Sequence, residues 1–190
     1  MSTSAETDPT FTAFAALRRV AAGTRPAIVA YLREHPGEAA PVLIFDDASG
    51  EQVDFDVRGA DPQAPAPAPS DEPAARSVGR PRLGVVAREV TLLPRHWEWL
   101  ARQPGGASVA LRKLVDEARQ VNAELDAQRA SREAAYRFMT AIAGDLPGFE
   151  EAARALFAGE RQRFESLIDG WAQDVRTHVS RLAGAAWSNE

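Results

Sequence analysis

Basic side chains in the middle of the sequence are the residues best suited to chemistry, because they can bind phosphate. Residues 76–119 carry 9 basic and 4 acidic side chains, whereas the whole chain has a net charge of −5. Such a stretch predicts a surface for nucleic acid, or a segment that docks onto the acidic parts of its own chain. The residues that we assign to a DNA contact are Arg80, Arg82, Arg88, Thr91, Ser108, Arg112 and Lys113.

A strand and two helices would position these side chains. Residues 83–93 are apolar and rich in β-branched side chains, which predicts a strand. Pro94 then opens a helix that ends at the turn 104–106, and Ser108 is placed to cap the next helix. This order of elements resembles a ribbon-helix-helix unit.

The ribbon-helix-helix resemblance implies a homodimer on double-stranded DNA. In such proteins one strand from each chain pairs into a ribbon in the major groove, and this pairing satisfies backbone groups that a lone strand leaves free. The start of the second helix, near Arg112 and Lys113, would hold a phosphate. Glu89 departs from the pattern, because it would face the DNA. The alternative is a strand and two helices that pack within a monomer.

Two tryptophans of the helix that begins at Pro94 have different expected roles. Trp97 and Trp99 are two residues apart, about 200° around a helix, so they cannot share a face. Trp97 aligns with Leu100, which predicts a core position. Trp99 is then a candidate interface residue, since tryptophan is enriched at binding hot spots. The alternative is that the C-terminal helices cover both sides of this helix.

The sequence predicts neither a metal site nor an enzyme. Asp46 and Asp47 could bind a hard cation together with Asp54 and Asp56. However, aspartate in a hairpin turn ordinarily hydrogen-bonds its own backbone, so we expect no metal and no other cofactor. The three histidines lack the spacing of a metal or catalytic set. No nucleophile elbow, phosphate loop or glycine fingerprint is present either, which predicts a protein without catalytic residues.

The overall pattern predicts an α+β fold. A small strand-helix-hairpin module is expected over 10–59, with a strand at 11–15, a helix at 25–34 and a hairpin over 41–57. Pro26 suits the first position of this helix, and Ile28 and Val29 share one of its faces. A proline-rich, disordered linker is expected over 60–79. A strand-helix-helix segment follows over 80–120, and a helical region over 121–186. Within the helical region, apolar spacing predicts one helix over 160–182. The spacing leaves open whether 107–143 is one helix or two.

Nearly the whole chain resembles a bacterial family known as domain of unknown function 2239. The resemblance is carried by the stretches Val42–Asp47 with Gly50, Arg80–Val86, Pro94–Leu100, Gly105–Glu117, and Tyr136–Met139 through Leu156. It implies an accessory bacterial protein of the cytoplasm. It implies no catalytic residue, because the family name carries no activity.

Composition sets the remaining expectations. The chain has no cysteine, which excludes disulfides and thiolate chemistry. No apolar run approaches the ~20 residues that a bilayer span needs, and the N-terminus has no secretory signal. We therefore expect a cytoplasmic protein without membrane contact. It would be a dimeric DNA-binding or regulatory protein whose N-terminal module binds a protein partner. The alternative is a non-enzymatic interaction protein that self-assembles through its helical region.

Overall fold

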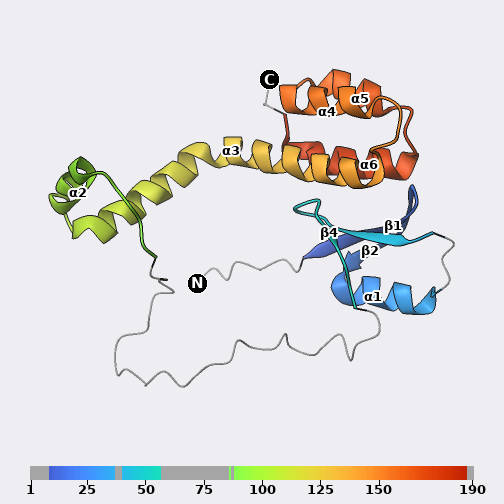
Figure 1. Ribbon diagram of the computed structural model, residues 1–190, viewed down its shortest axis with the longest axis horizontal. Coiled ribbons are helices and arrows are strands. Elements are labelled where there is room, and N and C mark those ends of the chain that lie inside the picture. The colour runs from blue at the N-terminus through green and yellow to red at the C-terminus, as the bar shows by residue number, and fades with distance from the viewer. Residues whose placement is uncertain (1–8, 37–39, 57–85, 87, 188–190) are drawn as a thin grey trace. The chain divides into compact units, whose positions relative to one another are not determined.

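The computed structural model describes residues 9–36, 40–56, 86 and 88–187 (Figure 1). Contacts between residues divide the chain into two compact units, Met1–Gln63 with Glu124–Glu190, and Ala64–Ala123. The linker expected at 60–79 lies outside the described residues. A small antiparallel sheet comes first in the chain and a mainly helical region follows, which confirms the expected α+β class.

The first unit begins with a four-stranded antiparallel sheet. Its strands are β1 (Thr10–Ala15), β2 (Arg18–Thr24), β3 (Val42–Asp46) and β4 (Gln52–Val53), in the order β2-β1-β3-β4, and helix α1 (Arg25–Glu34) follows β2. The strand at 11–15, the helix at 25–34 and the hairpin after residue 41 were all predicted. Strand β2 was not, because its run of arginine and alanine lacks the alternation that marks a strand.

Strand β1 is buried on both faces of the sheet. Phe11 and Ala13 of β1 belong to a small core with Ile28 of α1. Phe14, on the opposite face of the same strand, belongs to a larger core with Phe45 of β3 and many helical residues. Alternate side chains of a strand point to opposite faces. Strand β1 therefore joins two cores, which explains why Phe11–Ala15 are all buried.

Helices form the rest of the first unit. They are the C-terminal half of α3 (Gly106–Ile142), α4 (Phe149–Ala158), α5 (Arg161–Ile168), α6 (Gln173–Leu182) and the 3-10 turn η1 (Ala183–Ala185). The single helix predicted over 160–182 is wrong, because the chain leaves the helix between α5 and α6. At this break Trp171 is buried, and its indole nitrogen donates to the carbonyl oxygen of Pro147 at 2.9 Å.

The second unit contains α2 (Pro94–Ala101) and the first half of α3. Helix α2 begins at the proline that the sequence analysis assigned to its first position. Residues 107–142 lie in one helix, and at 1.5 Å per residue the 37 residues of α3 span about 55 Å. Residues 88–93 form neither helix nor strand, so the strand predicted over 83–93 is not present there. A strand needs a neighbour to pair with, and within this part of the described chain none lies beside 88–93.

Candidate functional site

The residues assigned to a DNA contact are distributed over three segments. Arg80 and Arg82 lie outside the described residues. Arg88 and Thr91 are exposed in the stretch without regular structure. The others are in the first two turns of α3, namely Ser108, Arg112 and Lys113. A ribbon needs a strand from each of two chains, and in the single chain residues 88–93 have no regular structure. The DNA contact of these residues stays a prediction.

The start of α3 differs from the predicted capped helix. The helix begins at Gly106, so Ser108 lies inside its first turn and is not the N-cap residue. The backbone oxygen of Ser108 accepts a hydrogen bond from Nε of Arg112 at 3.2 Å. Arg112 and Lys113 are exposed. Across residues 88–119 of the described chain, the basic side chains form no ion pair with a carboxylate, so their charge is available to a partner.

Apolar side chains are exposed along the first half of α3. The exposed fractions are 43% for Leu114, 81% for Val121 and 58% for Leu125. With Leu111 and Ala118 these residues are spaced alternately by three and four, which places all five on one face of a helix. We call Leu111, Leu114, Ala118, Val121 and Leu125 the α3 seam. Contiguous apolar surface is often the place where a partner binds, so the α3 seam is a candidate interaction surface.

Helix α2 adds two exposed tryptophans. The exposed fractions are 43% for Trp97 and 46% for Trp99. The prediction that Trp97 is a core residue is wrong, and Leu100 is the buried residue of this helix. The exposure of Trp99 fits its assignment as an interface residue, and its partner stays a prediction.

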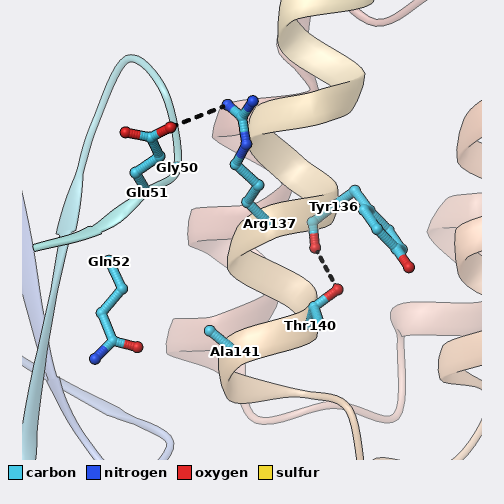
Figure 2. A pocket seen from close by; sticks show the side chains of 7 residues that line it. All are labelled: Gly50, Glu51, Gln52, Tyr136, Arg137, Thr140 and Ala141. Atoms are coloured by element: carbon cyan, nitrogen blue, oxygen red, sulfur yellow. Dashed lines mark hydrogen bonds and ion pairs between the residues drawn. The ribbon is translucent and has the colours of Figure 1, made fainter.

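A groove of about 410 Å³ lies between the β3–β4 turn and α3 (Figure 2). It is lined by Gly50, Glu51, Gln52, Tyr136, Arg137, Thr140 and Ala141. The hydroxyl of Thr140 donates to the backbone oxygen of Tyr136 at 2.9 Å, and Arg137 is engaged by the turn. Most polar side chains of the groove thus form hydrogen bonds or ion pairs within the protein. A ligand site instead presents convergent polar groups to its ligand.

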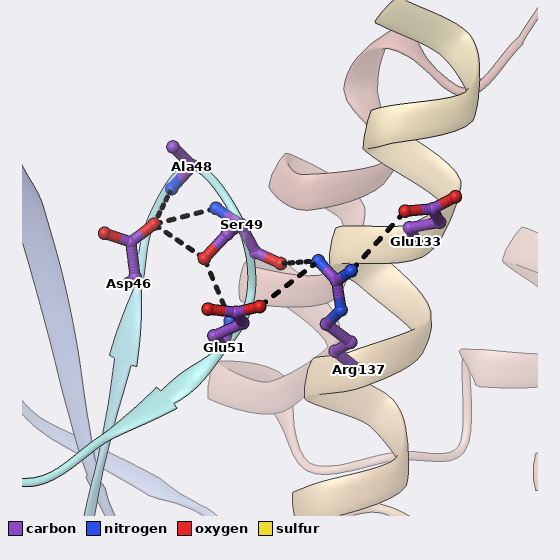
Figure 3. A network of polar contacts seen from close by, with 6 residues as sticks. All are labelled: Asp46, Ala48, Ser49, Glu51, Glu133 and Arg137. Carbon is purple, nitrogen blue, oxygen red and sulfur yellow. Dashed lines mark hydrogen bonds and ion pairs between the residues drawn. The ribbon is translucent and has the colours of Figure 1, made fainter. Parts of the chain in front are cut away.

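The β3–β4 turn is organised by Asp46 (Figure 3). Its Oδ1 accepts hydrogen bonds from the backbone nitrogens of Ala48 and Ser49, at 2.9 and 2.7 Å, and from Oγ of Ser49 at 3.0 Å. This is the turn chemistry that the sequence predicts for an aspartate here. Within the described segments, no group of three or more histidines and carboxylates could hold a metal ion.

Arg137 attaches this turn to α3 (Figure 3). Its Nη1 donates to the backbone oxygen of Ser49 at 3.1 Å and lies 3.9 Å from a carboxylate oxygen of Glu51. Its Nη2 lies 3.5 Å from the carboxylate of Glu133, one turn earlier in α3. Gly50 makes the approach possible, because a Cβ at this position would lie 2.0 Å from the backbone oxygen of Ala134.

A second polar cluster lies between the sheet and α6 and is partly buried. Asp47 accepts a hydrogen bond from Oγ1 of Thr12 at 2.7 Å and forms an ion pair with Arg181. Partial burial raises the pKa of Asp47, but the hydrogen bonds from Arg181 and Thr12 outweigh it, so the pKa is below its usual value. Asp47 is therefore a structural ion-pair partner of α6.

His178 is the buried titratable group of this cluster. Its side chain is 4% exposed, and its ring lies 4.5 Å from the ring of Phe138. Burial, and next the positive charge of Arg181, lowers the pKa of His178 to about 4. Nη2 of Arg181 lies 3.1 Å from Nδ1, which must then accept, so the neutral ring carries its proton on Nε2. Nε2 has no hydrogen-bond partner among the described residues.

Comparison with known families places the chain. The sequence model of a family described as uncharacterized proteins conserved in bacteria, DUF2239, matches residues 10–183. The chain belongs to this family. Comparison of this DUF2239 protein with curated proteins and with solved structures gave no match. Within the described stretches, no helix is long and apolar enough to cross a membrane.

The resemblance noted in the sequence coincides with contacts of the DUF2239 fold. The match runs from the first residue of β1 to the first residue of η1. Phe45 and Phe138 belong to two of the resembling stretches, and their rings meet at 4.9 Å in the larger core. Gly50 belongs to the same resembling stretch as Phe45 and lies against α3. These residues therefore maintain the fold of the DUF2239 protein, and they assign it no activity.

Two features of the DUF2239 protein were not predicted from the sequence: the full extent of the α3 seam and the cluster of Asp47 with Arg181. The α3 seam was readable, since its three-and-four spacing continues past Ala118 to Val121 and Leu125. The cluster of Asp47 with Arg181 was not, because 134 positions separate these residues. Only the packing of α6 against the sheet brings them together.

Proposed function

We propose that this DUF2239 protein is a non-enzymatic interaction protein that self-assembles through its helical region. The observation that carries this proposal is the exposed α3 seam. A surface helix ordinarily turns its apolar stripe toward a core and its polar residues toward water. The seam carries such a stripe, and Leu114, Val121 and Leu125 on it are exposed. A second chain would remove these side chains from water.

The polar side chains of the first unit support a non-enzymatic role. At the groove of Figure 2, Arg137 holds the β3–β4 turn and the hydroxyl of Thr140 is bonded within α3. Among the residues that the structure describes, His178 is the side chain whose pKa differs most from its ordinary value, and it lies in the core, away from solvent. A general base must reach the proton that it removes. A buried histidine between aromatic rings serves the packing of α6 instead.

Mass in solution tests this proposal. Light scattering on the full chain at micromolar concentration is expected to give about twice the chain mass of 20.5 kDa. Val121→Asp places a charge in the seam and is expected to return the mass to that of one chain. Ala123→Asp introduces the same side chain on the same helix but outside the seam, so it is expected to leave the dimer intact. A wild-type chain that is monomeric at this concentration would overturn the proposal.

DNA binding is a second candidate function, and the exposed basic residues favour it. Arg88, Arg112 and Lys113 are exposed and have no carboxylate partner within the described chain. If they bind phosphates, Arg88→Ala with Lys113→Ala should weaken binding to double-stranded DNA. The slope of log K against log salt should fall by about one for each phosphate that is no longer bound. Arg154→Ala, which removes a cation of α4 paired with Glu151, is the control. A slope that neither change alters would remove these residues from a DNA interface.

A further inference from the structure

The α3 seam has the residue spacing of a coiled coil. In a heptad written abcdefg, Leu111, Ala118 and Leu125 fall on position a, and Leu114 and Val121 fall on position d. Apolar residues at a and d form the contact between two supercoiled helices. The positions farthest from the seam are polar or small, as a water-facing side requires; they are Lys113, Asp116, Gln120 and Ala123.

The seam ends where the first unit begins to cover α3. Gln128 takes the next d position and is only 8% exposed. At the following a position, Nε of Arg132 donates to the backbone oxygen of Ala186 at 2.9 Å, so the protein's own C-terminal segment occupies this face. Ala135 and Met139 continue the same spacing inside the larger core. A partner helix therefore has access to about two heptads, from Leu111 to Leu125.

The charges beside the seam suit a second copy of α3 in one orientation. Glu117 and Glu124 lie at position g, and Arg129 lies at position e. In a parallel pair, position g of one helix faces position e of the other, five residues further along, and charges there choose partner and orientation. Glu124 would thus face Arg129 of the second copy. In an antiparallel pair position g faces position g, which would bring glutamates together.

The pairing is compatible with the interactions that these residues already make. Arg129 pairs with Asp126 within α3 at 3.1 Å, and both side chains are largely exposed. An exposed ion pair of this kind contributes little stability, so Arg129 can exchange partners at small cost. Short isolated helices are marginal in water. The body of the first unit holds the other half of α3, and that lowers the cost of ordering the seam for a partner.

We propose that two copies of this chain pair through α3 as a parallel, in-register coiled coil over residues 111–125, with Glu124 of each copy facing Arg129 of the other. The inference rests on the proposed function, because it gives the orientation and the register of the self-assembly. In this arrangement each seam residue meets its own copy. An antiparallel pair would instead set Leu114 near Leu125.

Single cysteines test the orientation cleanly, because the chain has none of its own. A disulfide forms when two Cα atoms lie within about 4.4–6.8 Å, so only residues that meet across the seam will link. Full-length chains with Val121→Cys or Leu114→Cys are oxidised and analysed on non-reducing gels. Ala123→Cys, outside the seam on the same helix, is the control. The mass of each reduced variant is measured by light scattering, which shows that the substitution preserves the dimer.

The expected result is that the two seam cysteines each link most of the protein into a covalent dimer, while the control links little. A reduced dimer in which only a mixture of Leu114→Cys and Leu125→Cys chains forms a disulfide would be antiparallel. That result would overturn the inference and leave self-assembly intact. A dimer that links through Ala123→Cys, or through none of these cysteines, overturns it as well. A chain that is monomeric when reduced and forms no disulfide overturns both proposals.

Discussion

The buried imidazole of His178 should make the stability of the protein depend on pH. The pKa is about 4 in the folded chain, whereas an exposed histidine has a pKa of 6.5. A proton therefore binds the unfolded chain more readily than the folded chain. Stability is fully present above pH 6.5, falls as the pH drops from 6.5 toward 4, and has no further histidine dependence below that.

The magnitude follows from the difference between the two pKa values. Each pKa unit corresponds to 1.36 kcal/mol, so a pKa lowered from 6.5 to about 4 represents about 3 kcal/mol in total. Between pH 7 and pH 4.5 most of this free energy disappears, about 2 kcal/mol. That is a large part of the 5–15 kcal/mol by which domains are ordinarily stable. The lowered pKa of Asp47 acts below pH 3.8, outside this window.

Urea unfolding at pH 7 and pH 4.5 measures the effect, with His178→Gln as the comparison. Glutamine keeps an acceptor for Arg181 but does not titrate. His35 and His96 are exposed and present in both proteins, so they cancel in the comparison. Between the two pH values, the free energy of unfolding of the wild-type chain should fall by about 2 kcal/mol more than that of the variant. If both proteins lose the same free energy, the imidazole is not held neutral in the core and the reasoning is wrong.

Further substitutions test the turn and the two halves of α3. Gly50→Ala should lower the free energy of unfolding in urea by at least about 2 kcal/mol, because strain at φ +67° adds to a clash with α3. Gly106→Ala should lower it by about 1 kcal/mol, because Gly106 has φ +78° but open space around it. Arg137→Met should lower the free energy of unfolding by about 1 kcal/mol, because it removes the hydrogen bond to the backbone oxygen of Ser49. No change in stability would mean that the turn packs against α3 through Gly50 alone. Phe138→Ala should lower the free energy of unfolding by about 3–5 kcal/mol. Val121→Ala, 81% exposed, should alter the unfolding of the dissociated chain, measured at low protein concentration, by less than about 0.5 kcal/mol yet weaken the dimer in light scattering. Equal costs at these two positions would contradict the division of α3 into a core half and an interface half.

Local patterns in the sequence were sufficient for most of the elements. Pro26 and the apolar pair Ile28 and Val29 predict α1 with its observed bounds. The elements that were not predicted correctly depend on contacts between residues far apart in the sequence. Strand β2 is held by pairing with β1, and its own alternation is weak. The break between α5 and α6 places Trp171 in the core, although the apolar spacing continues through it.

The exposed extent of the α3 seam could not be predicted from the sequence either. Leu114 and Val121 have the same spacing on α3 as Ala135 and Ile142. Periodicity identifies an apolar face, but it does not say whether the chain covers that face itself or leaves it for a partner. Only the structure separates the two cases, because the sheet and α6 pack against one half of α3.

A single helix thus carries one apolar pattern with two uses. Over residues 128–142 the pattern is covered by the protein's own core, and over 111–125 its residues are exposed or only partly buried. Because the helix is continuous across residue 125, this division comes from what covers each half of α3 and not from a change in the pattern itself. The proposed dimer would therefore extend along α3 only as far as the protein's own core leaves the apolar face open.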